Sequence, residues 1–152
     1  MSFSKELWGS NIWYLFHSLI YKIKEDKFND AKNDLIYVIK NISANLPCPE
    51  CSSHAQELLN KVDFNKINNK NEFKTMLFNF HNVINKKLNK PLFNIDDLDT
   101  KYNNCNIDVC YNNFKIIFTS NSNIPQLMTN SFHRKQQLPL IMQKLIALKQ
   151  FM

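Results

Sequence analysis

Apolar side chains recur every three or four residues along much of the chain, a spacing that predicts amphipathic helices. We expect the first helix to begin at a Ser4 cap and to carry the apolar seam Trp8, Ile12, Leu15, Leu19 and Ile23. The second should run from an Asp30 cap to Pro47, with the seam Leu35, Val38, Ile39 and Ile42. A third, shorter helix should open at residues 48–51 and reach about Lys61, carrying Leu58 and Leu59.

The second half of the chain begins with the clearest helical signal. After an Asn-rich loop at 65–71, a fourth helix should carry the seam Phe73, Leu77, Phe80, Ile84 and Leu88, with Pro91 beyond its end. Residues 96–102 predict a short fifth helix. The pattern then changes to a turn at 105–110, a short apolar run at 114–119 that is interpreted as a strand, and a loop at 121–125. A last amphipathic helix at 137–151 should carry Leu138, Ile141, Leu145 and Leu148.

These elements predict an all-α chain in two parts, residues 1–102 and a C-terminal extension at 103–152. The chain has 152 residues and 44% hydrophobic content, which is enough to bury a core. Its net charge of +6 comes from lysine, with Arg134 as the only arginine, which argues against nucleic acid as a partner. The sequence shows neither a membrane-spanning apolar run nor a signal-peptide pattern, so we expect a cytoplasmic location.

Cys48 and Cys51, spaced as C-x-x-C, are the strongest chemical signal in the chain. Two thiols at this spacing can close a disulfide, and the start of a helix favours the reactive thiolate. Structural disulfides are uncommon in the cytosol, so the pair indicates redox or metal chemistry. A zinc site completed by Cys105 and Cys110, or by His54, is the alternative, and the cysteine spacing alone leaves both interpretations open.

Two of the expected helices carry polar and aromatic side chains on one face. Gly9, Trp13 and His17 fall four residues apart on the first helix. Gly9 is the only glycine, and inside a helix it would let a flat group approach the backbone. The fourth helix has a polar patch made by His81, Asn82 and Asn85. The cations that follow are suited to a diphosphate: Lys86, Lys87 and Lys90. One glycine cannot form a glycine-rich nucleotide loop, so side chains such as these would have to hold any nucleotide cofactor. The competing explanation needs no cofactor: the Trp and His would be ordinary core residues, and the lysines would complement the dipole at the end of the helix.

Three motifs resemble, in order and spacing, the Erv/ALR family of FAD-linked sulfhydryl oxidases. They are W-G-x-x-x-W-x-x-x-H at residues 8–17, L-P-C-P-E-C at 46–51 followed by His54, and F-H-N-x-I-N-K-K-L-N-K-P at 80–91. The resemblance extends over roughly the first hundred residues, which makes it far more specific than a C-x-x-C alone. The sequence is most similar to the short forms carried by large cytoplasmic DNA viruses.

The resemblance implies a four-helix bundle with a short fifth helix, FAD held at the mouth of the bundle, and a homodimer. It implies that Cys51 lies against the flavin and that Cys48 meets thiol substrates. The residues that would contact FAD are Trp8, Gly9, Trp13, His17, Cys51, His81, Asn82, Asn85, Lys87, Lys90 and Tyr102. The implied reaction oxidises a dithiol protein substrate or a thioredoxin-like relay protein and reduces molecular oxygen to hydrogen peroxide. A viral enzyme of this kind would work in the host cytoplasm or in the virion.

The chain departs from the family pattern at two places. Cellular members carry a structural disulfide where this chain has Phe78 and approximately Ile95, so we expect apolar packing there instead. Cellular members also often carry a shuttle dithiol in a flexible tail. Cys105 and Cys110 are candidates for such a shuttle or for a structural disulfide that pins the extension. The rival function is a helical adaptor stabilised by zinc at both cysteine pairs, whereas a thioredoxin-like fold is disfavoured because helices flank the C-x-x-C.

Overall fold

The computed structural model describes residues 4–120 and 125–152, and these residues are almost entirely helical. The α-helices in them are α1 (Lys5–Lys22), α2 (Phe28–Ala44), α3 (Pro49–Asn60), α4 (Lys70–Lys87), α5 (Ile95–Tyr102), α6 (Ile107–Phe118) and α7 (Pro125–Leu148). Short 3-10 helices lie at Glu25–Lys27, Phe64–Lys66 and Lys149–Phe151. No strand occurs in the described ranges, which confirms the all-α prediction, and none of these helices is long and apolar enough to cross a membrane.

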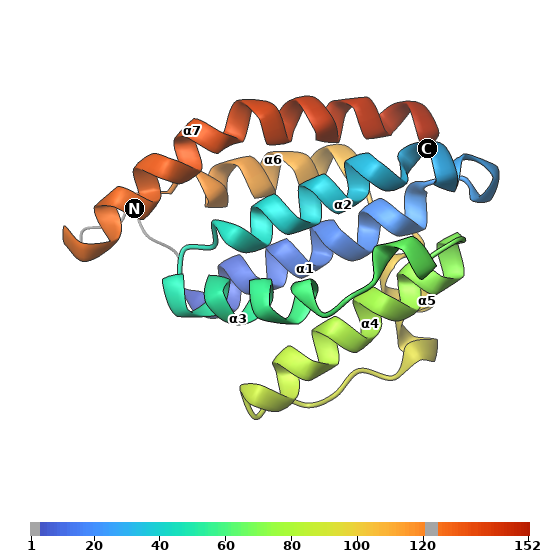
Figure 1. Cartoon of the computed structure of the whole chain (residues 1–152), viewed down its shortest axis with the longest axis horizontal. Coiled ribbons are helices and arrows are strands. Elements are labelled where there is room, and N and C mark those ends of the chain that lie inside the picture. Colours follow the sequence, from blue (N-terminus) through green and yellow to red (C-terminus); the bar gives the residue numbers. More distant parts are fainter. Residues whose placement is uncertain (1–3, 121–124) are drawn as a thin grey trace.

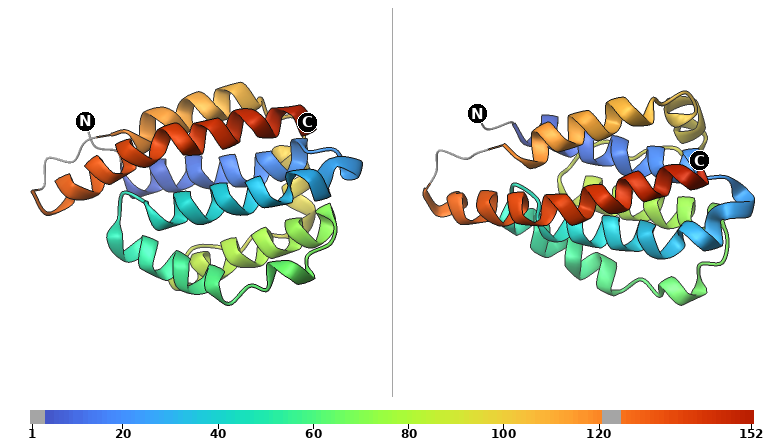
Figure 2. Two further views of the ribbon diagram at one scale, coloured as in Figure 1. Left: turned by 45° about the horizontal axis from the view of Figure 1, so that its top comes forward. Right: turned by 90° about the horizontal axis from the view of Figure 1, so that it is seen from above.

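The helices form three layers of two (Figures 1 and 2). Helices α1 and α2 make the middle layer. Helices α3 and α4 lie on one side, where α3 packs on α2 and α4 packs on α1. Helices α6 and α7 cover the other side, with α6 on α1 and α7 on α2. The short α5 returns the chain from α4 to α1. Helix α1 thus contacts α4 of one outer layer and α6 of the other.

The first four helices follow the expected pattern closely. Ser4 caps α1 by accepting a hydrogen bond from the backbone N–H of Leu7 at 3.3 Å. Helix α2 begins before the expected cap, so Asp30 lies inside its first turn rather than in front of it. The Asn-rich segment before α4 is shorter than expected because Asn69 caps the helix and exchanges hydrogen bonds with Glu72, its side-chain oxygen accepting from the Glu72 N–H at 2.9 Å.

The strand expected at residues 114–119 is wrong, because this segment forms the second half of α6. The Asn106 side chain starts the helix by accepting from the backbone N–H groups of Asp108 and Val109 at 3.0 and 3.2 Å. The buried positions that follow have helical spacing: Cys110, Tyr111, Phe114, Ile117 and Phe118. Aromatic and β-branched residues are typical of strands, and they hid this period. Cys110 therefore lies on a helix and not in a turn.

Helix α7 begins well before the expected residue 137. Its N-terminal half carries no apolar seam, since Met128 and Phe132 are 58% and 59% exposed. A buried polar residue fixes this half instead: Arg134 donates from Nε to the carbonyl oxygen of Phe118 at 3.0 Å, at the end of α6. Periodicity could not reveal a helix held in this way. The loop expected at 121–125 falls mostly outside the described residues.

One hydrophobic core runs through the three layers. Phe114 of α6 and Leu145 of α7 belong to the same fully buried cluster as Leu15 of α1 and Leu35 of α2. The hydroxyl of Tyr111 also donates to the Leu145 carbonyl oxygen at 2.6 Å, which joins α6 to α7. The extension therefore packs as part of the bundle, and the division of the chain at residue 103 stays a prediction.

Candidate functional site

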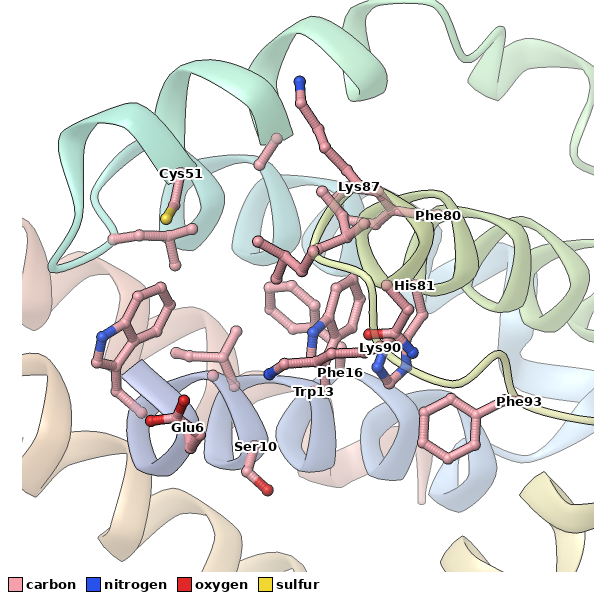
Figure 3. A pocket seen from close by; sticks show the side chains of 18 of the residues that line it. Glu6, Ser10, Trp13, Phe16, Cys51, Phe80, His81, Lys87, Lys90 and Phe93 are labelled. Atoms are coloured by element: carbon pink, nitrogen blue, oxygen red, sulfur yellow. The ribbon is translucent and has the colours of Figure 1, made fainter. Parts of the chain in front are cut away.

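A cavity of about 500 Å³ opens between α1, α3, α4 and the segment that joins α4 to α5 (Figure 3). This volume lies within the range of natural small-molecule sites, roughly 300–1,000 Å³. The cavity brings together most of the residues expected to contact a cofactor: Trp8, Gly9, Trp13, Cys51, His81, Asn85, Lys87, Lys90 and Tyr102. Helices distant in sequence thus converge on one site.

The C-x-x-C motif lies at the start of α3. Cys48 is the N-cap residue, and its Sγ accepts a hydrogen bond from the Cys51 backbone N–H at 3.2 Å. Pro49 occupies the first helical position, where the missing N–H has no cost. Cys51 lines the cavity whereas Cys48 is not among the lining residues, and Figure 3 shows the Cys51 side chain pointing from α3 toward α1. The helix N-terminus favours negative charge on sulfur, which suits thiolate chemistry.

Stacked aromatic rings form one wall of the cavity. The rings of Trp13 and His81 stack at a centroid distance of 4.0 Å and an interplanar angle of 8°. Behind them His17 meets the His81 ring nitrogen, Nε2 to Nδ1, at 3.0 Å. His17 also stacks on Tyr102 at 4.8 Å. The wall therefore offers flat faces for a planar ring system, held in place by a buried hydrogen bond.

His81 in this wall and His17 behind it are neutral at physiological pH. Burial, followed by the charge of Lys101, lowers the pKa of His17 from 6.5 to about 4. Burial, followed by the charges of His17, Lys101 and Lys90, lowers the pKa of His81 from 6.5 to about 3. In the neutral pair one ring donates its N–H to the other, so each imidazole keeps a fixed orientation.

The lysines reach the cavity because of the way α4 ends. Asn89 adopts a left-handed backbone with φ of 58°, its N–H donates to the Lys86 carbonyl at 3.2 Å, and the Lys90 N–H donates to the Asn85 carbonyl at 2.8 Å. This pattern is a Schellman motif, with asparagine in the position that glycine usually takes. It turns the chain sharply and leaves Lys87 and Lys90 beside the cavity, where Figure 3 shows Lys90 extending along α1. Their charges suit an anionic ligand.

Gly9 lies in the wall that α1 contributes. A Cβ atom placed there would meet no atom within 4 Å, so no packing within the chain requires a glycine at this position. The open space in front of the residue is the cavity itself. An absent side chain here leaves the backbone of α1 open to the cavity. The contact with a flat ligand that the sequence pattern indicated stays a prediction.

Two predicted contact residues lie outside the cavity wall. His17 is buried behind His81, so it supports the wall rather than forming it. Asn82 binds the backbone of Phe93 twice: its Oδ1 accepts from the N–H at 2.8 Å and its Nδ2 donates to the carbonyl at 3.2 Å. Asn82 thus holds the segment that carries Phe93 against the cavity.

The expected apolar clamp near Ile95 is wrong, since this side chain is 48% exposed and hydrogen bonding fixes the segment instead.

Phe93 and Lys101 are among the lining residues that sequence reasoning missed. The Phe93 ring contacts His81 at a centroid distance of 4.5 Å, and the Lys101 Nζ lies 4.8 Å above the Phe93 ring. Both come from the irregular segment and short helix after α4, where no periodic pattern marks a direction. The L-F dipeptide after Pro91 was the available signal, because it places an aromatic residue just beyond a turn that bears lysines.

The second cysteine pair lies away from the cavity. Cys105 precedes α6, and Cys110 lies on the buried face of this helix with its thiol against Ser18 of α1. No disulfide links any of the four cysteines in the structure. Among the described residues, no group of three or more His, Cys, Asp or Glu side chains could hold a metal ion. The two pairs therefore do not assemble the zinc site of the adaptor hypothesis.

The comparison with known proteins agrees with this geometry. The family model of the Erv1 / Alr family matches residues 10–103, so the chain belongs to this family. The match begins within α1 and ends just after α5, so it includes most of the helices that surround the cavity. No solved structure matches the chain at a significant level.

Its relatives include viral and plant proteins. A protein of Invertebrate iridescent virus 3, assigned by name to the FAD-linked sulfhydryl oxidases, is 30% identical over 92 residues, covering 60% of this chain and 62% of that protein. An FAD-linked sulfhydryl oxidase of African swine fever virus is 34% identical over 100 residues, 62% of this chain and 79% of the relative. The ERV1 oxidase of Oryza sativa is 31% identical over 90 residues, 59% and 46% of the two chains. The chain thus spans less than two thirds of the iridovirus and rice proteins.

Proposed function

We propose that this protein is an FAD-dependent sulfhydryl oxidase that makes disulfides in protein substrates and passes the electrons to oxygen. One observation carries the proposal: Cys51 of a C-x-x-C pair lines an aromatic, lysine-bearing cavity in a chain of the Erv1 / Alr family. The names of the relatives support the same activity and cofactor. A dithiol against a cavity of this composition needs an electron acceptor that fits the cavity.

The residues present fit FAD. Trp13 and His81 would stack on planar rings, and Gly9 would admit the ligand to the face of α1. Lys87 and Lys90 would bind the diphosphate. When bound, FAD supplies a two-electron acceptor that can be reoxidised by oxygen, with hydrogen peroxide as the product. The protein contributes position, a water-poor site and the orientation of the thiols.

The thiol chemistry follows from the position of each cysteine. A substrate thiolate attacks Sγ of Cys48 in the oxidised Cys48–Cys51 pair, forming a mixed disulfide and releasing Cys51 as a thiolate. A second substrate thiolate then displaces Cys48, so the substrate leaves as a disulfide and the C-x-x-C pair holds two more electrons. The Cys51 N–H that donates to Cys48 Sγ stabilises negative charge on this leaving sulfur. Cys51 lines the cavity, so it would be the thiol that faces a bound flavin and gives up the electrons.

The remaining expectations about partners are part of the proposal. The substrate would be a dithiol protein or a thioredoxin-like relay protein, and the enzyme would act in a cytoplasm or a virion. A homodimer is also proposed. Because α6 and α7 cover α1 and α2 on one side within the chain, the second copy would have to bind elsewhere. Light scattering of the purified protein measures this mass directly.

Spectroscopy and oxygen uptake test the proposed function. The purified protein should be yellow, with an absorption band at about 450 nm and one FAD per chain. With a dithiol such as dithiothreitol it should consume one oxygen and release one hydrogen peroxide for each disulfide formed. A colourless protein that contains zinc and unfolds with a chelator would contradict the proposal and favour the adaptor.

A further inference from the structure

We propose that Cys105 and Cys110 form a buried structural disulfide that staples the start of α6, and that they do not relay electrons to Cys48. The proposal concerns the fold of the extension, and it does not depend on the oxidase activity proposed above. It also distinguishes the two cysteine pairs of the chain by their surroundings.

The register of α6 puts the two cysteines at positions whose side chains are expected to lie close together. Asn106 is the N-cap, so Cys105 occupies the position before the cap and Cys110 the fourth position of the helix. Side chains at these two positions pack against each other at many helix starts, where an apolar pair forms a hydrophobic staple. Here both members of that pair are thiols. The contact that usually holds a helix entry by packing would here be replaced by a covalent bond.

The surroundings of the pair are closed. Cys105 is 3% exposed and Cys110 is 4% exposed, so neither sulfur is open to a partner protein. The Cys110 thiol points to α1, 3.8 Å from the hydroxyl oxygen of Ser18. Burial raises the pKa of this thiol, and neighbouring Cys105 raises it further, so the folded chain disfavours the thiolate that a relay requires. Cys48 differs: it caps a helix, is partly exposed and accepts an N–H on its sulfur.

The chemistry needs an oxidant, and it needs access. A thiolate of one cysteine attacks an external disulfide such as oxidised glutathione, and the other cysteine displaces the mixed disulfide. Two protons leave the cysteines, and two electrons pass to the glutathione, which is released as two thiols. Since α6 buries both sulfurs once it packs on α1, the bond should form before this packing or during local opening of the helix start.

The staple also bears on the cavity. The Cys105 N–H donates to the carbonyl oxygen of Tyr102 at 3.3 Å, directly at the end of α5. Tyr102 and Lys101 line the cavity from this helix, and Tyr102 packs edge-on against Tyr14 of α1 at 5.4 Å. A closed Cys105–Cys110 bond would hold the entry of α6 and the end of α5 together, and so fix one side of the cavity wall.

Differential alkylation of the full-length protein, refolded with a glutathione redox pair, tests the bond. We expect mild reductant to open Cys48–Cys51 under native conditions, while Cys105 and Cys110 become alkylated only after denaturation with reductant. Mass spectrometry of the peptides reads out each pair separately. Cys105 and Cys110 alkylated after denaturation without reductant, with Cys48–Cys51 oxidised, would overturn the proposal. This result does not depend on whether the protein turns over.

The Cys105→Val/Cys110→Val variant keeps an apolar staple and removes the bond, and Cys105→Ser/Cys110→Ser removes both. We expect the melting temperature of the oxidised Val variant to lie about 5 °C below that of the wild type, and the Ser variant to lie lower still. Turnover with dithiothreitol and with a reduced protein substrate should change by less than about twofold in the Val variant. A selective loss of at least about tenfold with the protein substrate would establish a relay and overturn the staple.

Discussion

The two outer layers use the same middle layer in different ways. On the α3–α4 side, α1 presents Gly9 and Trp13 to a cavity that holds Cys51 in its wall. On the α6–α7 side, the same helix packs against a closed apolar face in which Phe114 and Leu145 are fully buried. The difference indicates that the extension supplies packing energy while the family-matched part keeps open space for chemistry. Stability lost by leaving a cavity on one side can be offset by a well-packed layer on the other.

Removing one sulfur on the cavity side should have the largest effect. Cys51→Ser should lower turnover by about 1,000-fold or more, because electrons can no longer leave the dithiol, while FAD stays bound. Oxygen consumption and the visible spectrum measure the two properties. Cys110→Ser is the matched control on the extension side and should keep most of its activity. Equal losses in both variants would remove the distinction between the two layers.

Truncating a core side chain of the extension should affect stability and spare chemistry. Phe114→Ala should lower the free energy of unfolding by about 3–5 kcal/mol, since this ring is fully buried between α6 and α1. Urea denaturation measures the loss. Phe132→Ala on the exposed face of α7 should change stability by less than about 0.5 kcal/mol. Phe114→Ala protein that is folded at low temperature but has lost its flavin band would show that the layers do not divide these tasks.

The neutral histidine pair, with His81 in the cavity wall and His17 behind it, should make the apoprotein acid-sensitive. The pKa of His17 is about 4 in the folded state against 6.5 as its ordinary value, so the unfolded chain binds a proton first as pH falls. The free energy of unfolding should therefore be highest above about pH 6.5 and fall as the pH approaches about 4. Between about pH 7.5 and pH 5 this residue should lower it by about 2 kcal/mol. Urea midpoints across this range measure it. A His17→Asn variant with an unchanged pH dependence would contradict the assignment.

Substitutions at Gly9 should have the smallest effects and separate helix propensity from cavity volume. Gly9→Ala should stabilise the apoprotein by about 1 kcal/mol, because a Cβ atom there meets nothing within 4 Å. Gly9→Leu should give a similar gain in helix propensity but weaken FAD binding by about tenfold, since its side chain enters the cavity. Thermal melts and FAD titrations measure the two effects. Equal FAD affinities in the two variants would place the ligand away from Gly9.

The sequence reveals most of the site, because its chemistry depends on helix periodicity. The spacing of Gly9 and Trp13, the C-x-x-C motif and the lysines after α4 all identify side chains that line one cavity. The contacts that each side chain makes with residues distant in the sequence could not be predicted in this way. The motif resemblance implies that Asn82 contacts the cofactor, and this stays a prediction. The structure adds that its amide holds the backbone of Phe93, a contact set by a segment without periodicity.

The extension is harder to predict for a related reason. Helix α6 has strand-like composition, and the first half of α7 is held by the buried Arg134 rather than by an apolar seam. Tertiary packing on α1 and α2 decides both elements, and it overrides local propensity. The same limit applies to Cys105 and Cys110. Their proposed structural role depends on the N-cap residue between them and on their burial, and the sequence shows neither.

Anaerobic mixing with a dithiol tests the central claim most directly, namely that Cys51 lies against a flavin in the cavity of α1, α3 and α4. When dithiothreitol is added without oxygen, the wild-type protein reconstituted with FAD should lose its absorption band at about 450 nm. The loss should take no longer than one catalytic turnover. Cys51→Ser protein with the same FAD content should stay yellow. Loss of the band at equal rates in both proteins, or failure of the wild type to bind FAD, would contradict the account.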